Sequence, residues 1–158
     1  MVWSSRHDLP ETVRATSVGL LSQQLVLLID LRLRAKQAHW NVKGLQFIAL
    51  HELFDSIDDD VAELADDVAE RAVALGGLAL GTAEVVARES SLPPYDARLL
   101  AGGDHIRALG NSLAAVAKSA RSAIDAAAEA GDLDTSDVFT QVSRALDKLL
   151  WKVEAHEV

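Results

Sequence analysis

Five residues within a 32-residue window constrain this 158-residue chain more than any other feature of its sequence. They are His39, His51, Asp55, Asp66 and Glu70. His51 and Asp55 are four residues apart, and so are the two acids that follow, a spacing that places side chains on one face of an α-helix. Asp55 and Asp66 are eleven residues apart, close to three full turns, so the last four residues fall within about 100° of arc. The spacing predicts one long helix with these four side chains along one face.

The chemistry and the spacing of these residues together indicate a metal site shared between two chains. Two imidazoles and three carboxylates form a mixed nitrogen and oxygen ligand set, which suits iron or zinc better than calcium or magnesium. Along a helix, Asp55 and Asp66 lie about 16 Å apart, whereas metal–ligand bonds are about 2.0–2.2 Å long. A second copy running antiparallel about a two-fold axis would bring its pair of acids to the first chain's histidine and aspartate. We therefore expect two equivalent intersubunit sites per dimer.

Composition bounds the class of protein. The chain is 49% hydrophobic but only 4% aromatic, which favours helices packed on small residues over a sheet. The length predicts one domain, residues 1–158, with 1–9 as a short N-terminal extension. We expect no membrane span and no signal peptide, and the sequence contains no cysteine. These features predict a cytoplasmic protein, with association with the nucleoid as the alternative.

Apolar periodicity and turn signals predict four long helices and one short helix. Pro10 and Glu11 indicate the first start, and Asn41 to Gly44 should end that helix and form a tight connection. A second helix is expected from about 45 to the glycines at 76–77, a third over about 103–130, and a fourth from about 134 almost to the end. A short helix capped by Thr82 should lie in the connection between the second and third. This order predicts an all-α, ferritin-like four-helix bundle.

Three stretches carry a resemblance to a known family. The segments KQAHWNVKGLQFIALHELFD (36–55), DDVAERAVALGG (66–77) and DTSDVFTQVSRALDKLLWKVEAH (134–156) resemble the Dps family of mini-ferritins. The likeness runs from about residue 10 to the end, and its His-x11-His-x3-Asp-x10-Asp-x3-Glu spacing is highly specific. None of the five histidines has a glutamate three residues before it. The sequence therefore does not indicate the Glu-x-x-His pairs of a conventional di-iron site within one bundle.

The resemblance implies a ferroxidase centre at the two-fold interface of a hollow shell of twelve subunits. One subunit would supply His39, His51 and Asp55, and its partner Asp66 and Glu70. It implies that the protein oxidises Fe(II), with hydrogen peroxide as the preferred oxidant, and stores ferric oxyhydroxide inside the cage. Two alternatives stay open: a nucleoid-associated, DNA-protecting cage that depends little on ferroxidase chemistry, and a zinc-regulated cage, because the ligand set also accepts Zn(II) as a competitor.

Two further groups of acids are candidate metal contacts. Asp134 and Asp137 stand where the resemblance places the lining of three-fold pores for Fe(II) entry, although aspartate at a helix start is also favoured as a cap. One could cap the helix while the other faces the pore. The second helix also carries an acidic run that is typical of a solvated face: Asp58, Asp59, Asp60, Glu63, Asp66 and Asp67. Three acids of this helix share the helical face of Glu70 and could line the cavity and seed ferric mineral: Glu52, Asp59 and Glu63.

Direct DNA binding is not expected. The net charge is −9, and residues 1–12 contain one arginine, no lysine and two acids. Binding to DNA depends on cationic groups that displace phosphate counterions. A cationic surface that binds DNA would form only if assembly brought together scattered residues such as Arg6, Arg14 and Lys118.

Two tryptophans and the remaining histidines receive no catalytic assignment. Trp40 and Trp151 are expected to be packing residues, with interception of oxidising equivalents as the alternative for Trp40 beside its ligand histidine. His7, His105 and His156 lack partners at ligand spacing, and we assign them no role.

Overall fold

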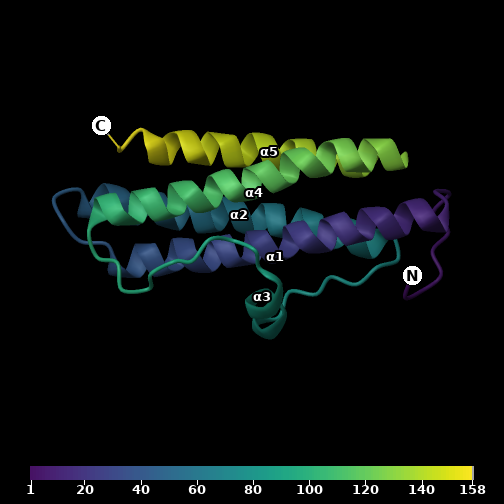
Figure 1. Ribbon diagram of the computed structural model, residues 1–158, viewed down its shortest axis with the longest axis horizontal. Coiled ribbons are helices and arrows are strands. Elements are labelled where there is room, and N and C mark those ends of the chain that lie inside the picture. The colour runs from purple at the N-terminus through teal and green to yellow at the C-terminus, as the bar shows by residue number, and fades with distance from the viewer. Residues whose placement is uncertain (158) are drawn as a thin grey trace.

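The fold is the expected all-α bundle (Figure 1). The computed structural model describes residues 1–157, and within them helices are the only regular elements longer than an isolated bridge. The helices are α1 (Glu11–Asn41), α2 (Phe47–Ala74), α3 (Ala83–Glu89), α4 (Gly102–Ala130) and α5 (Leu133–Glu154). Every predicted helix is present, with boundaries within about two residues of the sequence-based ones, except that α5 ends at Glu154 and so earlier than expected.

The helix ends follow from local sequence. Pro10 immediately precedes α1, where its fixed φ suits a helix start. Gly76 and Gly131, which follow the ends of α2 and α4, have φ values of 90° and 91°. That left-handed conformation is strained for residues with a Cβ, so glycine is the residue that ends these helices cleanly. Thr82 precedes α3 as predicted, but its side chain makes no capping hydrogen bond.

The bundle consists of two antiparallel helix pairs. α1 packs mainly against α2 and α4 against α5, and α1 also contacts α4 (Figure 1). A long crossover joins α2 to α4 and carries α3, which lies outside the four long helices and against α1. Phe54 and Phe139 are the largest fully buried side chains, within a core that is otherwise mainly Leu, Val and Ala. The crossover ends beside the α1–α2 turn, where the Lys43 N–H donates to the Leu100 carbonyl at 2.8 Å.

α1 passes one test that the sequence was not expected to pass. It is long and apolar enough, by length and composition alone, to cross a membrane. The core helix of a bundle passes the same test, and α1 here packs against α2, α3 and α4. A membrane location is therefore not indicated.

The two tryptophans also differ from expectation. Trp40 is 69% exposed and Trp151 is 66% exposed, so neither packs in the core of this chain. Leu45, in the α1–α2 turn, and Ile48, at the start of α2, are exposed as well. The apolar surface near His39 and His51 is thus uncovered within a single chain.

Candidate metal centre

Two histidines face each other where the α1–α2 hairpin closes. His39 lies in the last turn of α1 and His51 near the start of α2, and their rings stack with centroids 3.7 Å apart. Each ring bonds to the other residue's backbone: His39 Nδ1 is 2.8 Å from the His51 carbonyl oxygen, and His51 Nδ1 is 2.8 Å from the His39 carbonyl oxygen. The turn between the helices thus holds both rings in a reciprocal pair.

This pairing fixes which ring nitrogen can bind a metal. A carbonyl oxygen only accepts hydrogen bonds, so each Nδ1 carries the proton and donates it. The lone pair of each neutral imidazole is then on Nε2. Metal-binding histidines are commonly held in this way, with the second nitrogen bonded to a backbone carbonyl or a carboxylate. Both residues fit the role of nitrogen ligands to Fe(II) or Zn(II).

Asp55 lies beside the histidines and is bound by a lysine. Its Oδ1 accepts a hydrogen bond from Lys36 Nζ and is 3.8 Å from His39 Nδ1. The hydrogen bond lowers the pKa of Asp55 and raises the pKa of Lys36. The carboxylate is therefore ionised and ready to bind a cation, but Lys36 already occupies one of its oxygens. Sequence reasoning missed Lys36, although it lies three residues before His39 and so shares a helical face with it.

Asp58 corrects the interpretation of the acidic run. Only 6% of Asp58 is exposed, so it is not part of a solvated face. Arg32 Nε donates to its Oδ1 at 2.8 Å, and Lys36 Nζ lies 3.7 Å from its Oδ2. The three acids expected on the helical face of Glu70 are exposed on α2: Glu52, Asp59 and Glu63.

Asp66 and Glu70 are exposed further along α2. Within residues 1–157, no group of three or more His, Asp or Glu side chains is arranged to hold a metal ion. One chain thus supplies His39, His51 and Asp55 at one end of the hairpin and the two acids towards the other. The structure does not bring all five residues together in a single chain.

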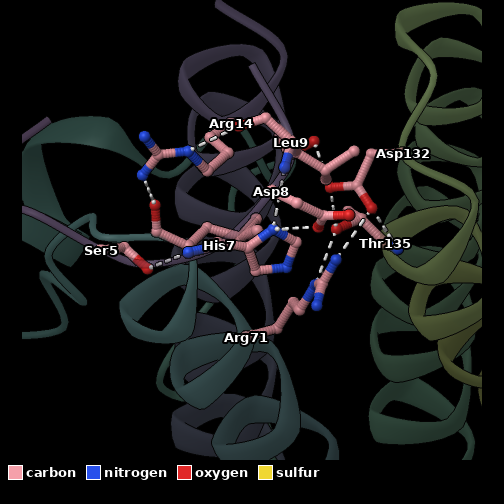
Figure 2. Close-up of polar contacts among 10 residues, drawn as sticks. Ser5, His7, Asp8, Leu9, Arg14, Arg71, Asp132 and Thr135 are labelled. Carbon is pink, nitrogen blue, oxygen red and sulfur yellow. Dashed lines mark hydrogen bonds and ion pairs between the residues drawn. The ribbon is translucent and has the colours of Figure 1, made fainter. Parts of the chain in front are cut away.

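The start of α5 contains a buried aspartate that sequence reasoning missed (Figure 2). Asp132, 1% exposed, is the residue before α5, and it accepts hydrogen bonds from the Thr135 backbone, the Thr135 hydroxyl, Ser17 and Arg71. Burial raises the pKa of Asp132, but the hydrogen bonds and the Arg71 charge outweigh burial and leave the pKa lowered. Asp132 therefore caps the helix. The prediction that Asp134 or Asp137 does so was wrong, and both are exposed.

The N-terminal segment packs against the same end of the molecule. The Val2 N–H donates to the Gly76 carbonyl. Arg14 donates to the carbonyls of Leu9 and Leu75, and Figure 2 shows Arg14 beside Leu9. Arg14 is only 9% exposed. It holds backbone groups inside the chain and is not available to a basic surface, which corrects its inclusion among the scattered cations.

His105 is completely buried near the start of α4. Its Nδ1 lies 2.9 Å from the Tyr95 hydroxyl, which joins the crossover to α4. Burial lowers the pKa of His105, against smaller opposing effects of the Leu99 backbone and Asp104. Burial also raises the pKa of Tyr95 to about 12. Tyr95 is thus a phenol that donates its proton in a hydrogen bond to a neutral imidazole.

Known proteins share this architecture along its whole length. The ferritin-like domain model matches residues 18–157. The chain is 45% identical over 152 residues to a DNA protection during starvation protein of Agrobacterium fabrum, covering 96% of this chain and 94% of that relative. The Mycobacterium smegmatis Dps structure in its tetragonal form has a TM-score of 0.91 at 30% identity, covering 99% and 94% of the two chains. Dps from Microbacterium arborescens in the high iron form has a TM-score of 0.86 at 34% identity, covering 94% and 96%.

The helical order and these matches define a ferritin-like protein. Within that class, the chain belongs to the Dps family.

Proposed function

We propose that this protein is a cytoplasmic ferroxidase that oxidises Fe(II) and stores ferric oxyhydroxide inside a cage of twelve identical subunits. The reciprocal His39–His51 pair carries the proposal, because it holds both imidazoles with Nε2 as the metal-binding atom beside an ionised carboxylate. Asp66 and Glu70 are exposed, as residues that complete a neighbour's site must be. A two-fold interface would supply them from the partner.

The proposed chemistry needs little from the protein beyond binding. Histidine and carboxylate ligands leave coordination positions open for an oxidant, as redox sites of non-haem iron require. Two ferrous ions would each give one electron to one hydrogen peroxide molecule, whose O–O bond breaks without release of a hydroxyl radical. Both oxygens end as oxide or hydroxide on ferric iron, and hydrolysis of the ferric ions releases protons. The high iron form of the relative from Microbacterium arborescens supports iron as the metal.

Anaerobic titration of the purified protein with Fe(II) and hydrogen peroxide tests the proposal. We expect about one peroxide consumed per two ferrous ions, iron that co-elutes with the protein, and an assembly of twelve chains of 16.9 kDa. His51→Ala should slow oxidation without changing the mass of the assembly. Added Zn(II) should compete at the same site and slow the wild type. Oxidation at the rate of free iron in buffer would refute the proposal.

DNA protection is the second candidate function, and the names of relatives favour it. We propose that any such protection is indirect, through removal of Fe(II) and peroxide. The chain has a net charge of −9. Residues 1–9 contain a single arginine, and Val2 is hydrogen-bonded to the turn after α2, so this segment does not form a free cationic arm. Phosphate contacts from lysine and arginine supply most of the affinity for DNA.

A gel-shift titration with duplex DNA separates direct from indirect protection. We expect no retarded complex at low micromolar cage concentration, in about 150 mM salt without magnesium, because counterion release needs a cationic surface. A retarded complex there would favour the DNA-binding cage. Protection of DNA from Fe(II) and peroxide that is lost in His51→Ala would instead favour indirect protection.

A further inference from the structure

One lysine lies between two carboxylates beside the candidate metal centre. Lys36, on α1, donates a hydrogen bond to Asp55 and lies 3.7 Å from Asp58, both on α2. The Asp55 side chain is 43% exposed and carries the proposed metal-binding oxygens, whereas the Asp58 side chain is only 8% exposed. The same ammonium group therefore has one partner that is a candidate ligand and another that is not.

Helix geometry places these charges in facing pairs. Arg32 and Lys36 are four residues apart on α1, and Asp55 and Asp58 are three apart on α2, so each pair shares a helical face. Arg32 binds Oδ1 of Asp58, while the Oδ2 atom of Asp58 is the one nearer Lys36. Asp58 can accept from both cations at once, because a carboxylate has two oxygens. No displacement of Arg32 is needed for Lys36 to bind Asp58 fully.

A metal ion bound to Asp55 would repel Lys36. Lys36 binds Oδ1 of Asp55, which leaves Oδ2 for a metal ion, but a divalent cation and an ammonium group on one carboxylate lie close enough to repel each other strongly. If Lys36 left Asp55 for water, the site would lose an ion pair without compensation. Asp58 offers a second carboxylate at a distance that a lysine side chain covers by rotating its flexible stem.

We propose that Asp58 accepts Lys36 when a divalent cation binds Asp55, and that this transfer sets the metal affinity of the site. Asp58 is a positioning residue, since it acts on the metal through Lys36. The proposal rests on the assignment of His39, His51 and Asp55 as metal ligands. It adds to that assignment a displaceable internal cation that competes with the metal.

Binding of Co(II) to the assembled, iron-free protein, measured by calorimetry and visible absorption, tests the transfer without any oxidation step. Asp58→Asn should weaken Co(II) binding about tenfold, because Lys36 then has Asp55 as its main partner. Lys36→Met should strengthen it by a similar factor, because the competing cation is gone. In the Lys36→Met background, Asp58→Asn should change the affinity by less than about threefold. An equal effect of Asp58→Asn in both backgrounds would overturn the proposal.

Arg32→Gln is the matched control for the ion pair itself. It breaks the same Arg32–Asp58 pair as Asp58→Asn, but it leaves the acceptor for Lys36 in place. We expect tighter Co(II) binding in Arg32→Gln and weaker binding in Asp58→Asn. A purely structural ion pair predicts weaker binding in both, which would refute the transfer. If Asp58→Asn fails to assemble, Arg32→Gln is measured in the Lys36→Met background instead. The transfer predicts that Arg32→Gln no longer tightens Co(II) binding there, because no lysine is left to move to Asp58.

His51→Ala separates this proposal from the proposed function. If Co(II) binding does not depend on His51, the site assignment itself is wrong. If binding depends on His51 but the Lys36 and Asp58 effects are additive, the site stands and the transfer is refuted.

Discussion

The two ends of the α1–α2 hairpin treat their polar side chains in opposite ways. At the end where α2 finishes, Asp132 is buried and accepts four hydrogen bonds from residues of its own chain. At the end where the hairpin turns, the two histidines use only Nδ1 within the chain, and Lys36 binds only one oxygen of Asp55. The hydrogen bonds at the Asp132 end are complete within a single chain, and we call it the closed end. Those at the turn are not, and we call it the open end.

This difference separates structural from functional polar groups. A buried carboxylate whose lone pairs are all used has nothing left to offer a ligand, so Asp132 stabilises the fold. Polar groups that are held in place but keep an unused lone pair are prepared for something outside the chain. The comparison therefore predicts that changes at the turn affect iron chemistry, and changes at the closed end affect stability.

Complementation between two inactive variants should give the largest effect. His51→Ala and Asp66→Ala should each lower the ferroxidase rate about a hundredfold or more as homomers, because each lacks a ligand in every site. Co-assembled equal mixtures should regain roughly a quarter of wild-type activity, since about half of the two-fold interfaces pair unlike chains and each of these holds one intact site. The measurement is the initial rate of Fe(II) oxidation. Mixed cages as inactive as their parents would show that the site is not shared.

The sequence predicted the helices well because they depend on local signals. Apolar periodicity, Pro10 and the glycines at 76 and 131 each act within one turn of the chain. The five-residue spacing also predicts that the site needs a partner chain, and that part stays a prediction. What it could not supply were contacts between helices, which depend on register and rotamer. Lys36 against Asp55 and Arg14 against the carbonyl of Leu75 join residues on different helices or loops.

The capping of α5 shows the same limit on a smaller scale. Asp132, Asp134 and Asp137 all stand near the start of one helix, and each is a chemically suitable cap. Only the structure shows that Asp132 faces Ser17 and Arg71 in the interior, while the other two are exposed. The choice was made by tertiary contacts more than 60 residues away in sequence.

Replacing the buried aspartate tests the closed end. Asp132→Asn should lower the free energy of unfolding by about 3–5 kcal/mol, because it leaves the Arg71 guanidinium without its buried partner. The exposed pair Arg121–Asp147 provides the control, and Asp147→Asn should cost no more than about 1 kcal/mol. Denaturant titration at fixed protein concentration measures both. If Asp132→Asn assembles like the wild type but binds Co(II) more weakly, the closed end also affects the metal site. That result would contradict the distinction between the two ends.

Asp134 and Asp137 test the comparison at the closed end itself. They lie at the start of α5, close to Asp132 in sequence, but their side chains are exposed. Replacing both with Asn should slow initial iron uptake about tenfold at low salt, since a ring of carboxylates focuses cations into a channel. Stability and Co(II) binding at the hairpin should not change. Glu84→Gln with Glu89→Gln, two exposed acids of α3, removes the same charge elsewhere. Equal uptake rates in the two double variants would exclude Asp134 and Asp137 from the entry route.

The smallest expected effect is the contribution of His105 to the pH dependence of stability. It lies near the open end but is buried, and burial lowers its pKa below that of the unfolded chain. Between the two pKa values the unfolded state binds more protons, so stability falls as the pH drops below about 6.5. The slope due to one such group is at most about 1.4 kcal/mol per pH unit. Urea midpoints of the metal-free protein between pH 7.5 and pH 5 measure this slope.

His105→Asn isolates that contribution. The Asn side-chain oxygen can take the place of Nδ1 and accept the Tyr95 hydroxyl proton, but it does not titrate. The variant should therefore be less stable at pH 7.5, through poorer packing, yet lose less stability on acidification than the wild type. His7→Asn is the control, because His7 is only partly buried, in an N-terminal segment that is mostly exposed. If acidification destabilises the wild type and His105→Asn equally, the pH dependence comes from the other histidines.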